Sequence, residues 1–305
     1  MASSSIGHVR HVMSHIISAN PESVLDVGVG FGRWGFLCRE LLDAFAGRVR
    51  KDQWRTRIEG VEIFEAYVQD HQRYIYDKIH IGNAKDIVPS LGVYGVIIIG
   101  DMLEHLGKDD AWGLFRSAMD RARIGLILNI PIGEGWLRGD VSENIYEDHL
   151  SWWALAEFAD FKPDTYLTTL MNGMEHASMF ISRANYEYTK KLADGEKAEA
   201  MGDAAGAVSI YTDALRLVHD REEAYALLTG LYLSQNDYGR AEGALTALST
   251  ACPWYLQGRL MLANLQLALG KKEAAIENLN AIIATPRADA EMVKSAREAL
   301  LGVKS

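Results

Sequence analysis

The chain has 305 residues, and its 31 basic and 41 acidic residues give a formal net charge of −10. This length suggests two domains of ~100–200 residues each, and a composition of 49% hydrophobic and 24% charged residues excludes collagen-like and disordered proteins. Because an acidic surface repels a phosphate backbone, the charge disfavours non-specific binding to nucleic acid.

Membrane and secretion signals are also missing from the sequence pattern. The longest apolar runs, VYGVIIIG and IGLILNIPIG, are shorter than the ~18 residues that a membrane-spanning helix needs. The N-terminal segment MASSSIGHVRH lacks the apolar core of a secretion signal. Two cysteines, Cys38 and Cys252, are too few for a disulfide framework or a cysteine metal site. We therefore expect a cytoplasmic protein without membrane association.

The pattern of the chain changes near residue 184. Before it, short β-branched runs alternate with amphipathic segments, which predicts βαβ units and a largely parallel sheet. These runs are residues 24–28, 57–63, 78–83, 95–101, 125–131, 165–171 and 175–183. After it, apolar residues recur at helical spacing. We predict an α/β domain over residues 1–183 and an all-α domain over residues 184–305.

The helical part is repetitive. Three sets of residues recur every 34 positions: Gly202, Asn236 and Gly270; Ala207, Ala241 and Ala275; Tyr211, Leu245 and Leu279. A 34-residue helix-turn-helix period with a small residue where helices cross resembles the tetratricopeptide (TPR) repeat. The segment ADAEMVKSAREALLG is then a closing helix. The resemblance implies either a homodimer interface or a surface for a protein partner.

The most informative segment is VLDVGVGFGRWG, residues 24–35. An apolar strand reaches Asp26 and is followed by Gly28, Gly30 and Gly32 before a helical run begins. Glycines at such a turn let the backbone approach a ligand at the helix N-terminus. The acidic residue before the glycines, as in D-x-G-x-G-x-G, resembles class I S-adenosylmethionine (SAM) methyltransferases rather than dinucleotide-binding enzymes. The resemblance implies SAM as cofactor, with Asp26 either binding it or bracing the turn.

Later strand ends extend this resemblance. Glu62 ends the second strand and matches the family's ribose-binding acid, for which a carboxylate suits two hydroxyl donors. Asn83 matches the residue near the adenine amine, and Asp101 lies at the end of the fourth strand, facing the cleft. The family's fold is a Rossmann-like seven-stranded sheet, mostly parallel, whose final hairpin is antiparallel. Residues 165–171 and 175–183 match that hairpin.

The catalytic prediction concerns histidines, since removing a hydroxyl proton calls for a base whose pKa lies near working pH. His149 lies in EDHLSWW, which resembles a segment of several small-molecule and sugar O-methyltransferases. His105 follows the fourth strand. We predict His149 or His105 as the base, with Asp101 orienting the acceptor.

A metal site is the alternative use of the same residues. Asp101, Glu104 and His105 form D-x-x-E-H, and His149 completes a set of oxygen and imidazole ligands suited to Mg²⁺ or Mn²⁺. This pattern is similar to one in terminal small-RNA 2′-O-methyltransferases and to one in ubiquinone-type O-methyltransferases. It also occurs in members of the superfamily without a metal, where the two residues cap a helix or position substrate.

Two further groups allow both a functional and a structural interpretation. His8, His11 and His15 share one helical face, which predicts either contact with the acceptor or a half-buried polar face. The tryptophans at 34, 136, 152 and 153 either line an acceptor pocket or belong to the core.

Together these observations predict a SAM-dependent methyltransferase that O-methylates a small hydroxylated acceptor, such as a sugar, a glycan unit or a specialised metabolite. Two alternatives remain. One is a metal-dependent RNA 2′-O-methyltransferase, and the other is a non-catalytic TPR adaptor with a degenerate methyltransferase domain.

Overall fold

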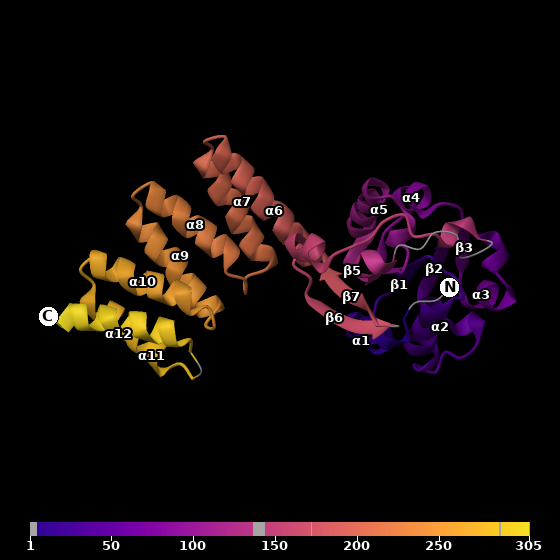
Figure 1. The fold of residues 1–305 in the computed structure, drawn as a ribbon, viewed down its shortest axis with the longest axis horizontal. Helices are drawn as coiled ribbons and strands as arrows, with labels where there is room; N and C mark the ends of the chain where they lie inside the picture. Colours follow the sequence, from indigo (N-terminus) through magenta and orange to yellow (C-terminus); the bar gives the residue numbers. More distant parts are fainter. Residues whose placement is uncertain (1–4, 137–143, 172, 287, 305) are drawn as a thin grey trace. The chain divides into compact units, whose positions relative to one another are not determined.

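A computed structural model describes residues 5–136, 144–171, 173–286 and 288–304. The chain divides into two compact units, Met1–Tyr186 (unit 1) and Glu187–Ser305 (unit 2), and the division falls within helix α6 (Arg183–Ala200). Across the described ranges, none of the helices combines the length and apolar character required for a membrane span. Figure 1 shows strands in unit 1 and helices alone in unit 2.

Unit 1 is built on one seven-stranded sheet. Its order is β3-β2-β1-β4-β5-β7-β6, and only β7 runs antiparallel to its neighbours, β5 and β6. The strands are β1 (Ser23–Val27), β2 (Arg57–Glu62), β3 (Lys78–Ile81), β4 (Tyr94–Gly100), β5 (Ala122–Pro131), β6 (Thr165–Met171) and β7 (Met174–Ser182). The predicted mostly parallel sheet with a final antiparallel hairpin is confirmed.

Helices cover both faces of this sheet. They are α1 (Val9–Ala19), α2 (Arg33–Arg39), α3 (Asp70–Ile75), α4 (Ala84–Ile87) and α5 (Lys108–Arg121). Alternate residues of one strand point to opposite faces, so Ile98 packs with α1 and α2 while Ile97 and Ile99 pack with α5. The central strands are therefore apolar throughout, as expected for parallel strands buried on both faces.

The described part of unit 2 contains most of α6 and six further helices. These are α7 (Ala204–Leu217), α8 (Glu223–Ser234), α9 (Tyr238–Ala251), α10 (Leu256–Ala268), α11 (Lys272–Ala284) and α12 (Ala290–Lys304). The recurring alanines, Ala207, Ala241 and Ala275, are fully buried. The small side chain allows close approach of paired helices, as the repeat predicted.

The turns of unit 2 explain the other recurring position. Gly202, Asn236 and Gly270 have φ values of 79°, 57° and 76°, so each turn places one residue in the left-handed region. Glycine adopts this region without steric cost, and asparagine tolerates it better than most residues. The all-α TPR-like prediction and the closing helix α12 are confirmed.

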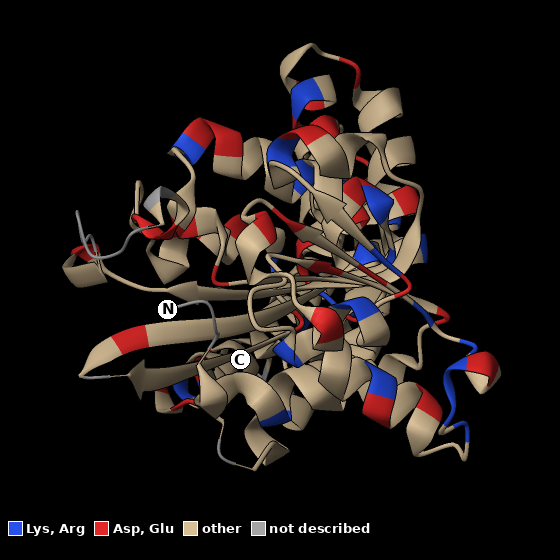
Figure 2. Ribbon diagram, turned by 90° about the vertical axis from the view of Figure 1, so that its right-hand side faces the viewer, with Lys and Arg blue, Asp and Glu red and all other residues tan. Residues whose placement is uncertain are grey.

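Charged residues are interspersed over the ribbon of the molecule, with acidic and basic positions close together on the helices and loops (Figure 2). The most basic segment of the sequence, GRVRKDQWRTR, follows this rule. Arg48 pairs with Asp43 at 2.8 Å, and Arg57 pairs with Glu59 at 3.1 Å. These ion pairs neutralise part of the segment's charge.

Candidate active site

A cavity of about 350 Å³ opens at the carboxyl ends of the parallel strands in unit 1. It lies where the strand order reverses between β1 and β4, which is the usual ligand position in open α/β sheets. It is lined by predicted cofactor or catalytic residues at or just after the ends of the four strands β1 to β4: Gly28, Gly30, Glu62, Asn83 and Asp101. His105 also lines it.

The glycine turn between β1 and α2 forms one wall of the cavity. Gly28 has φ +87°, and a Cβ there would lie 3.3 Å from the side chain of Met102. A larger residue would therefore be strained and would press against the wall opposite. Gly32 also has φ +87°, but it caps α2 and is not among the described residues that line the cavity.

Asp26 lies beneath this turn rather than in the cavity. Its side chain is fully buried, and its Oδ2 accepts a hydrogen bond from the Tyr76 hydroxyl at 2.5 Å. The same hydroxyl accepts the Gly35 backbone N–H at 3.1 Å, so the carboxyl braces the start of α2 through Tyr76. Burial raises the pKa of Asp26 to about 7. Tyr76 was not singled out in the sequence, where no pattern links it to Asp26.

Glu62 connects the glycine turn to the end of β2. Its side chain is 6% exposed, and its two carboxylate oxygens accept the backbone N–H groups of Gly30 at 2.8 Å and of Phe64 at 2.9 Å. A carboxylate has about four acceptor positions, so two backbone bonds leave capacity for hydroxyl donors. Asn83 begins α4, and its Oδ1 accepts the Lys85 backbone N–H at 3.1 Å.

Asp101 follows β4 with φ +51°, an uncommon value for a residue other than glycine. Its Oδ1 is hydrogen-bonded to Nε2 of His176, a residue of β7 that is 2% exposed. His176 was not predicted as a site residue. The sequence did contain one indication of it. His8, His11 and His15 share one helical face, and such a polar face is expected to pack against polar side chains of a neighbouring element.

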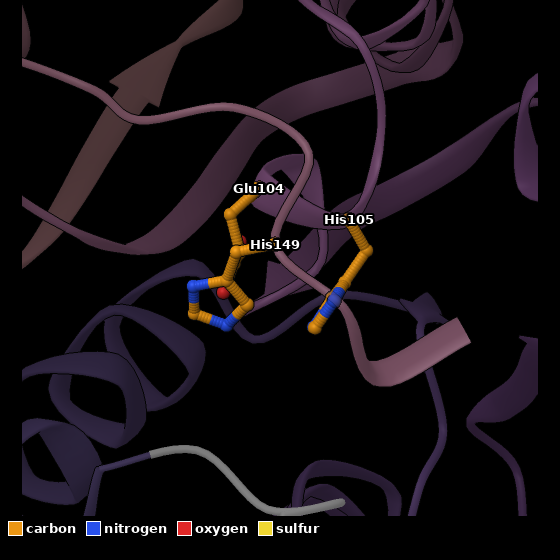
Figure 3. A group of neighbouring side chains, drawn as sticks. All are labelled: Glu104, His105 and His149. Atoms are coloured by element: carbon orange, nitrogen blue, oxygen red, sulfur yellow. The ribbon is translucent and has the colours of Figure 1, made fainter. Parts of the chain in front are cut away.

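Glu104, His105 and His149 come together as a second group of polar side chains (Figure 3). One potential ligand atom from each lies within 4.8 Å of the others. The backbone carbonyl of Glu104 accepts the N–H groups of Leu150 at 2.7 Å and Ser151 at 3.1 Å, which holds the His149 segment against the short 3-10 helix Leu103–His105.

The three members of this group differ in burial. Glu104 is 2% exposed, and its Oε2 has no hydrogen-bond partner among the residues that the structure describes. Burial, together with the negative charge of Asp101, raises the pKa of Glu104 well above its usual range. The imidazole rings of His105 and His149 are edge to face at 4.9 Å, and His149 is not among the described lining residues. Asp101, the fourth predicted metal ligand, is not part of this group.

The predicted aromatic residues have different positions. Trp34 lines the cavity, whereas Trp153 is fully buried in the core beside Phe158. Trp136 lies between His149 and His176, with ring centroids 6.5 and 5.9 Å away.

No model of a known protein family matches the chain, and no curated protein matches it. Among solved structures, the chain is similar to an O-methyltransferase from Bacillus cereus in complex with S-adenosylhomocysteine (SAH). The two are 15% identical, the match covers 59% of this chain and 83% of the other chain, and the TM-score is 0.38. Magnesium protoporphyrin IX methyltransferase from Synechocystis PCC 6803 with bound SAH is 15% identical over 58% of this chain and 82% of its own, with a TM-score of 0.42.

A further similarity is to a tetratricopeptide domain. The first TPR of Spaghetti, bound to an HSP90 peptide, is 15% identical over 39% of this chain and 94% of its own, with a TM-score of 0.32. The solved structures to which the chain is similar thus include both methyltransferases and a TPR domain.

Proposed function

We propose that unit 1 is a SAM-dependent methyltransferase that transfers a methyl group to a hydroxyl of a small acceptor. The observation that carries this proposal is the convergence of Gly28, Gly30, Glu62, Asn83 and Asp101 on one cavity at the switch point of the sheet. They come from four segments of the sequence, and each segment lies at the end of a different strand.

The residues at the cavity fit the cofactor. The turn at Gly28 and Gly30 leaves no side chain between backbone and ligand, and the Glu62 carboxylate keeps acceptor capacity for a pair of ribose hydroxyls. Asn83, beside β3, offers an amide for the edge of an adenine ring. A cavity of about 350 Å³ lies within the ~300–1,000 Å³ of typical small-molecule sites. When bound, the cofactor would supply a methyl group on a positively charged sulfur.

Aromatic and acidic groups in and beside the cavity would serve the acceptor. Tyr67, Tyr146 and Leu150 line the cavity, and the Tyr67 hydroxyl donates to Glu147 at 3.1 Å. Aromatic faces suit sugar rings or planar phenols, and carboxylates accept hydrogen bonds from hydroxyls. This lining supports a sugar, a glycan unit or a phenolic metabolite as acceptor.

His105 would receive the hydroxyl proton. It lines the cavity, and its Nδ1 lies 3.1 Å from the backbone carbonyl of Asp148, which leaves Nε2 for the acceptor. As the acceptor oxygen bonds to the methyl carbon and the carbon–sulfur bond breaks, the proton would pass to this nitrogen. His149, beside His105, would then orient that ring.

A metal-dependent reaction is the second candidate. It is favoured by the convergence of Glu104, His105 and His149 and by the buried Glu104 Oε2 without a partner among the described residues. One oxygen and two imidazole ligands would suit Mn²⁺ better than Mg²⁺, which prefers oxygen alone. Such an ion would lower the pKa of an acceptor hydroxyl.

The RNA and adaptor alternatives are less well supported. The ion pairs of Arg48 and Arg57 reduce the charge that the basic segment can offer to a phosphate backbone. The intact glycine turn and Glu62 argue for cofactor binding and against a degenerate domain. For unit 2 we propose homodimerisation or recognition of a protein partner, which light scattering at several protein concentrations would separate.

Calorimetric titration with S-adenosylhomocysteine (SAH) tests the cofactor site. We expect micromolar binding that is lost in Glu62→Ala. The titration is repeated with Mn²⁺, with Mg²⁺ and after treatment with EDTA, since a change in binding heat would support the metal site. Failure to bind SAH under all these conditions would leave the TPR adaptor as the better account.

Transfer of radiolabelled methyl from SAM to a panel of probes then tests the acceptor class. The panel contains catechol, caffeic acid, methyl glucoside, methyl rhamnoside and a short single-stranded RNA. Label in a phenol or glycoside supports the proposal. Label in RNA alone, lost at raised salt, would favour the RNA methyltransferase instead.

A further inference from the structure

Helix α1 lies along the final hairpin of unit 1, and two of its histidines meet a threonine of β6 there (Figure 1). His11 and His15 are about one helical turn apart, so their side chains lie on the same face of α1. Thr165, the first residue of β6, lies against both rings. The two rings are half-buried and Thr165 is exposed, so a solvated ion can reach the three side chains.

The polar atoms of these side chains are close enough to share one ion. Nε2 of His11 and Nε2 of His15 are 3.3 Å apart, and the Thr165 hydroxyl oxygen lies 3.0 Å from the first and 2.7 Å from the second. The ring centroids are 4.8 Å apart, so the two nitrogens are turned toward the space between the rings. At a metal–nitrogen distance of ~2.05 Å, a separation of 3.3 Å gives an N–metal–N angle of about 107°, close to that of a tetrahedral site.

Residues of β7 hold both rings in this arrangement. Nδ1 of His11 lies 2.8 Å from the hydroxyl of Ser178, which is fully buried. When Nδ1 donates its hydrogen to this oxygen, Nε2 of His11 keeps a lone pair for an ion. Metal-binding histidines usually have such an oxygen partner at the other ring nitrogen. The ring of His15 stacks on Phe180 at 4.5 Å, which restricts the plane of that ring.

The kinds of donor at this point indicate the kind of ion. Two imidazole nitrogens suit Zn²⁺, Ni²⁺ or Cu²⁺, whereas Mg²⁺ and Ca²⁺ prefer oxygen ligands alone. The carboxylate of the neighbouring Asp164 accepts the backbone N–H of Ser182 at 2.6 Å and its hydroxyl at 3.0 Å, so we count it as a nearby charge and not as a ligand.

We propose that His11, His15 and Thr165 form a binding site for Zn²⁺. The two Nε2 atoms and the Thr165 hydroxyl are the protein ligands, and water completes the coordination. Because the histidines belong to α1 and the threonine to β6, the ion fastens α1 to the hairpin. Without an ion, the same atoms hold the contact through hydrogen bonds. The site does not rest on the proposed methyltransferase function, since none of the three is among the described residues that line the cavity.

Calorimetric titration of the full chain with ZnCl₂, after treatment with EDTA and dialysis, tests the site. The titration is made in the wild type and in His149→Gln, which takes one ligand from the separate group around Glu104. In His149→Gln we expect one micromolar site for Zn²⁺ and much weaker binding of MgCl₂.

Single substitutions in the His149→Gln protein then locate the zinc. His11→Gln or His15→Gln should weaken binding by more than the ~10–100-fold expected when only a residue that orients a ligand is lost. Ser178→Ala should weaken it by about tenfold. His219→Gln, at an exposed histidine of unit 2, is the matched control and should not change the affinity. Unchanged zinc affinity in both His11→Gln and His15→Gln would overturn the site.

Spectra of the wild type give a test that does not depend on how well the variants fold. In long-range ¹H–¹⁵N correlation spectra of the ¹⁵N-histidine-labelled protein, one equivalent of ZnCl₂ should move the Nε2 signals of His11 and His15. The signal of His80, which is bonded through Nε2 to Glu59 at 2.8 Å, should stay in place. Shifts confined to histidines other than His11 and His15 would refute the proposal.

Amide hydrogen exchange tests whether the ion fastens α1 to the hairpin. If α1 leaves the hairpin only after the ion is released, Zn²⁺ at 100 times its Kd should slow exchange in α1 by up to about 100-fold and leave α9 unchanged. Thr165→Val should remove most of this protection, whereas Thr168→Val, on the opposite face of β6, should retain it. Zinc binding without slower exchange would show that α1 alone holds the ion, which would overturn the role assigned to Thr165. The proposed methyltransferase function stands or falls separately, through the SAH titration.

Discussion

Replacing Glu62 by glutamine removes one charge and one acceptor oxygen from the centre of the proposed cofactor site. The two carboxylate oxygens now accept the N–H groups of Gly30 and Phe64 at 2.8 and 2.9 Å. A glutamine has a single oxygen, so its NH₂ group would face one of these N–H donors. Each hydrogen bond to a charged group contributes ~1.5–3 kcal/mol.

The expected loss of SAH affinity follows from these bonds. Only the ribose hydroxyl bond differs between the free and the bound protein, because the backbone bond at the glycine turn is lost in both, so the affinity loss is ~1.5–3 kcal/mol. At about 1.4 kcal/mol for each factor of ten, SAH should bind ~10–100-fold more weakly to Glu62→Gln, as measured by calorimetric titration.

A matched control lies three residues away. Glu65→Gln removes the same charge from an exposed side chain and should leave SAH affinity within about twofold, because exposed charges interact weakly. If Glu62→Gln binds SAH within about threefold of the wild type, the carboxylate does not hold the cofactor. The assignment of the cavity would then be wrong.

Three further predictions concern the supports of the two units. Gly35→Ala would place a Cβ 2.1 Å from the Tyr76 ring, so we expect a loss of ~2–5 kcal/mol in urea denaturation, whereas Gly113→Ala, with open space around it, should be neutral or stabilising. The pKa of Asp26 is raised to about 7, so the folded state binds its proton more tightly than the unfolded state, and stability falls as pH rises. Relative to Asp26→Asn, the wild type should therefore lose up to about 4 kcal/mol between pH 4 and pH 8, and parallel pH profiles would contradict this. Ala241→Leu, at a fully buried helix crossing, should lower the melting temperature of unit 2 in calorimetry but leave SAH binding intact; loss of binding would show that the units are coupled.

The fold was predictable because its signals are local and repeated. Apolar strands such as Tyr94–Gly100 are buried along their whole length, and the left-handed turns at Gly202, Asn236 and Gly270 recur with the helices. The parallel sheet then brings strand ends together regardless of their separation in the chain. For that reason Glu62 and Asp101 could be placed at one edge from the sequence.

The structure divides the predicted metal set. The sequence analysis grouped Asp101, Glu104, His105 and His149 because their oxygen and imidazole groups suit one ion. Asp101 instead precedes the short helix Leu103–His105 and has a left-handed backbone, with φ +51°. Its carboxylate is paired with His176, while Glu104 lies with His105 and His149.

The pairing of Asp101 with His176 depends on a contact between the end of β4 and β7, across 75 residues of sequence. The helical face of His8, His11 and His15 was visible in the sequence, as was the alternation of β7, but neither period identifies its partner. The partner is set by the antiparallel return of β7 beside β5, which places His176 opposite Pro131 and next to the end of β4. A strand that ran parallel to β5 would carry His176 to the other edge of the sheet, away from Asp101. The reversed final hairpin therefore does more than complete the sheet, since it brings a histidine to the edge where the cavity lies.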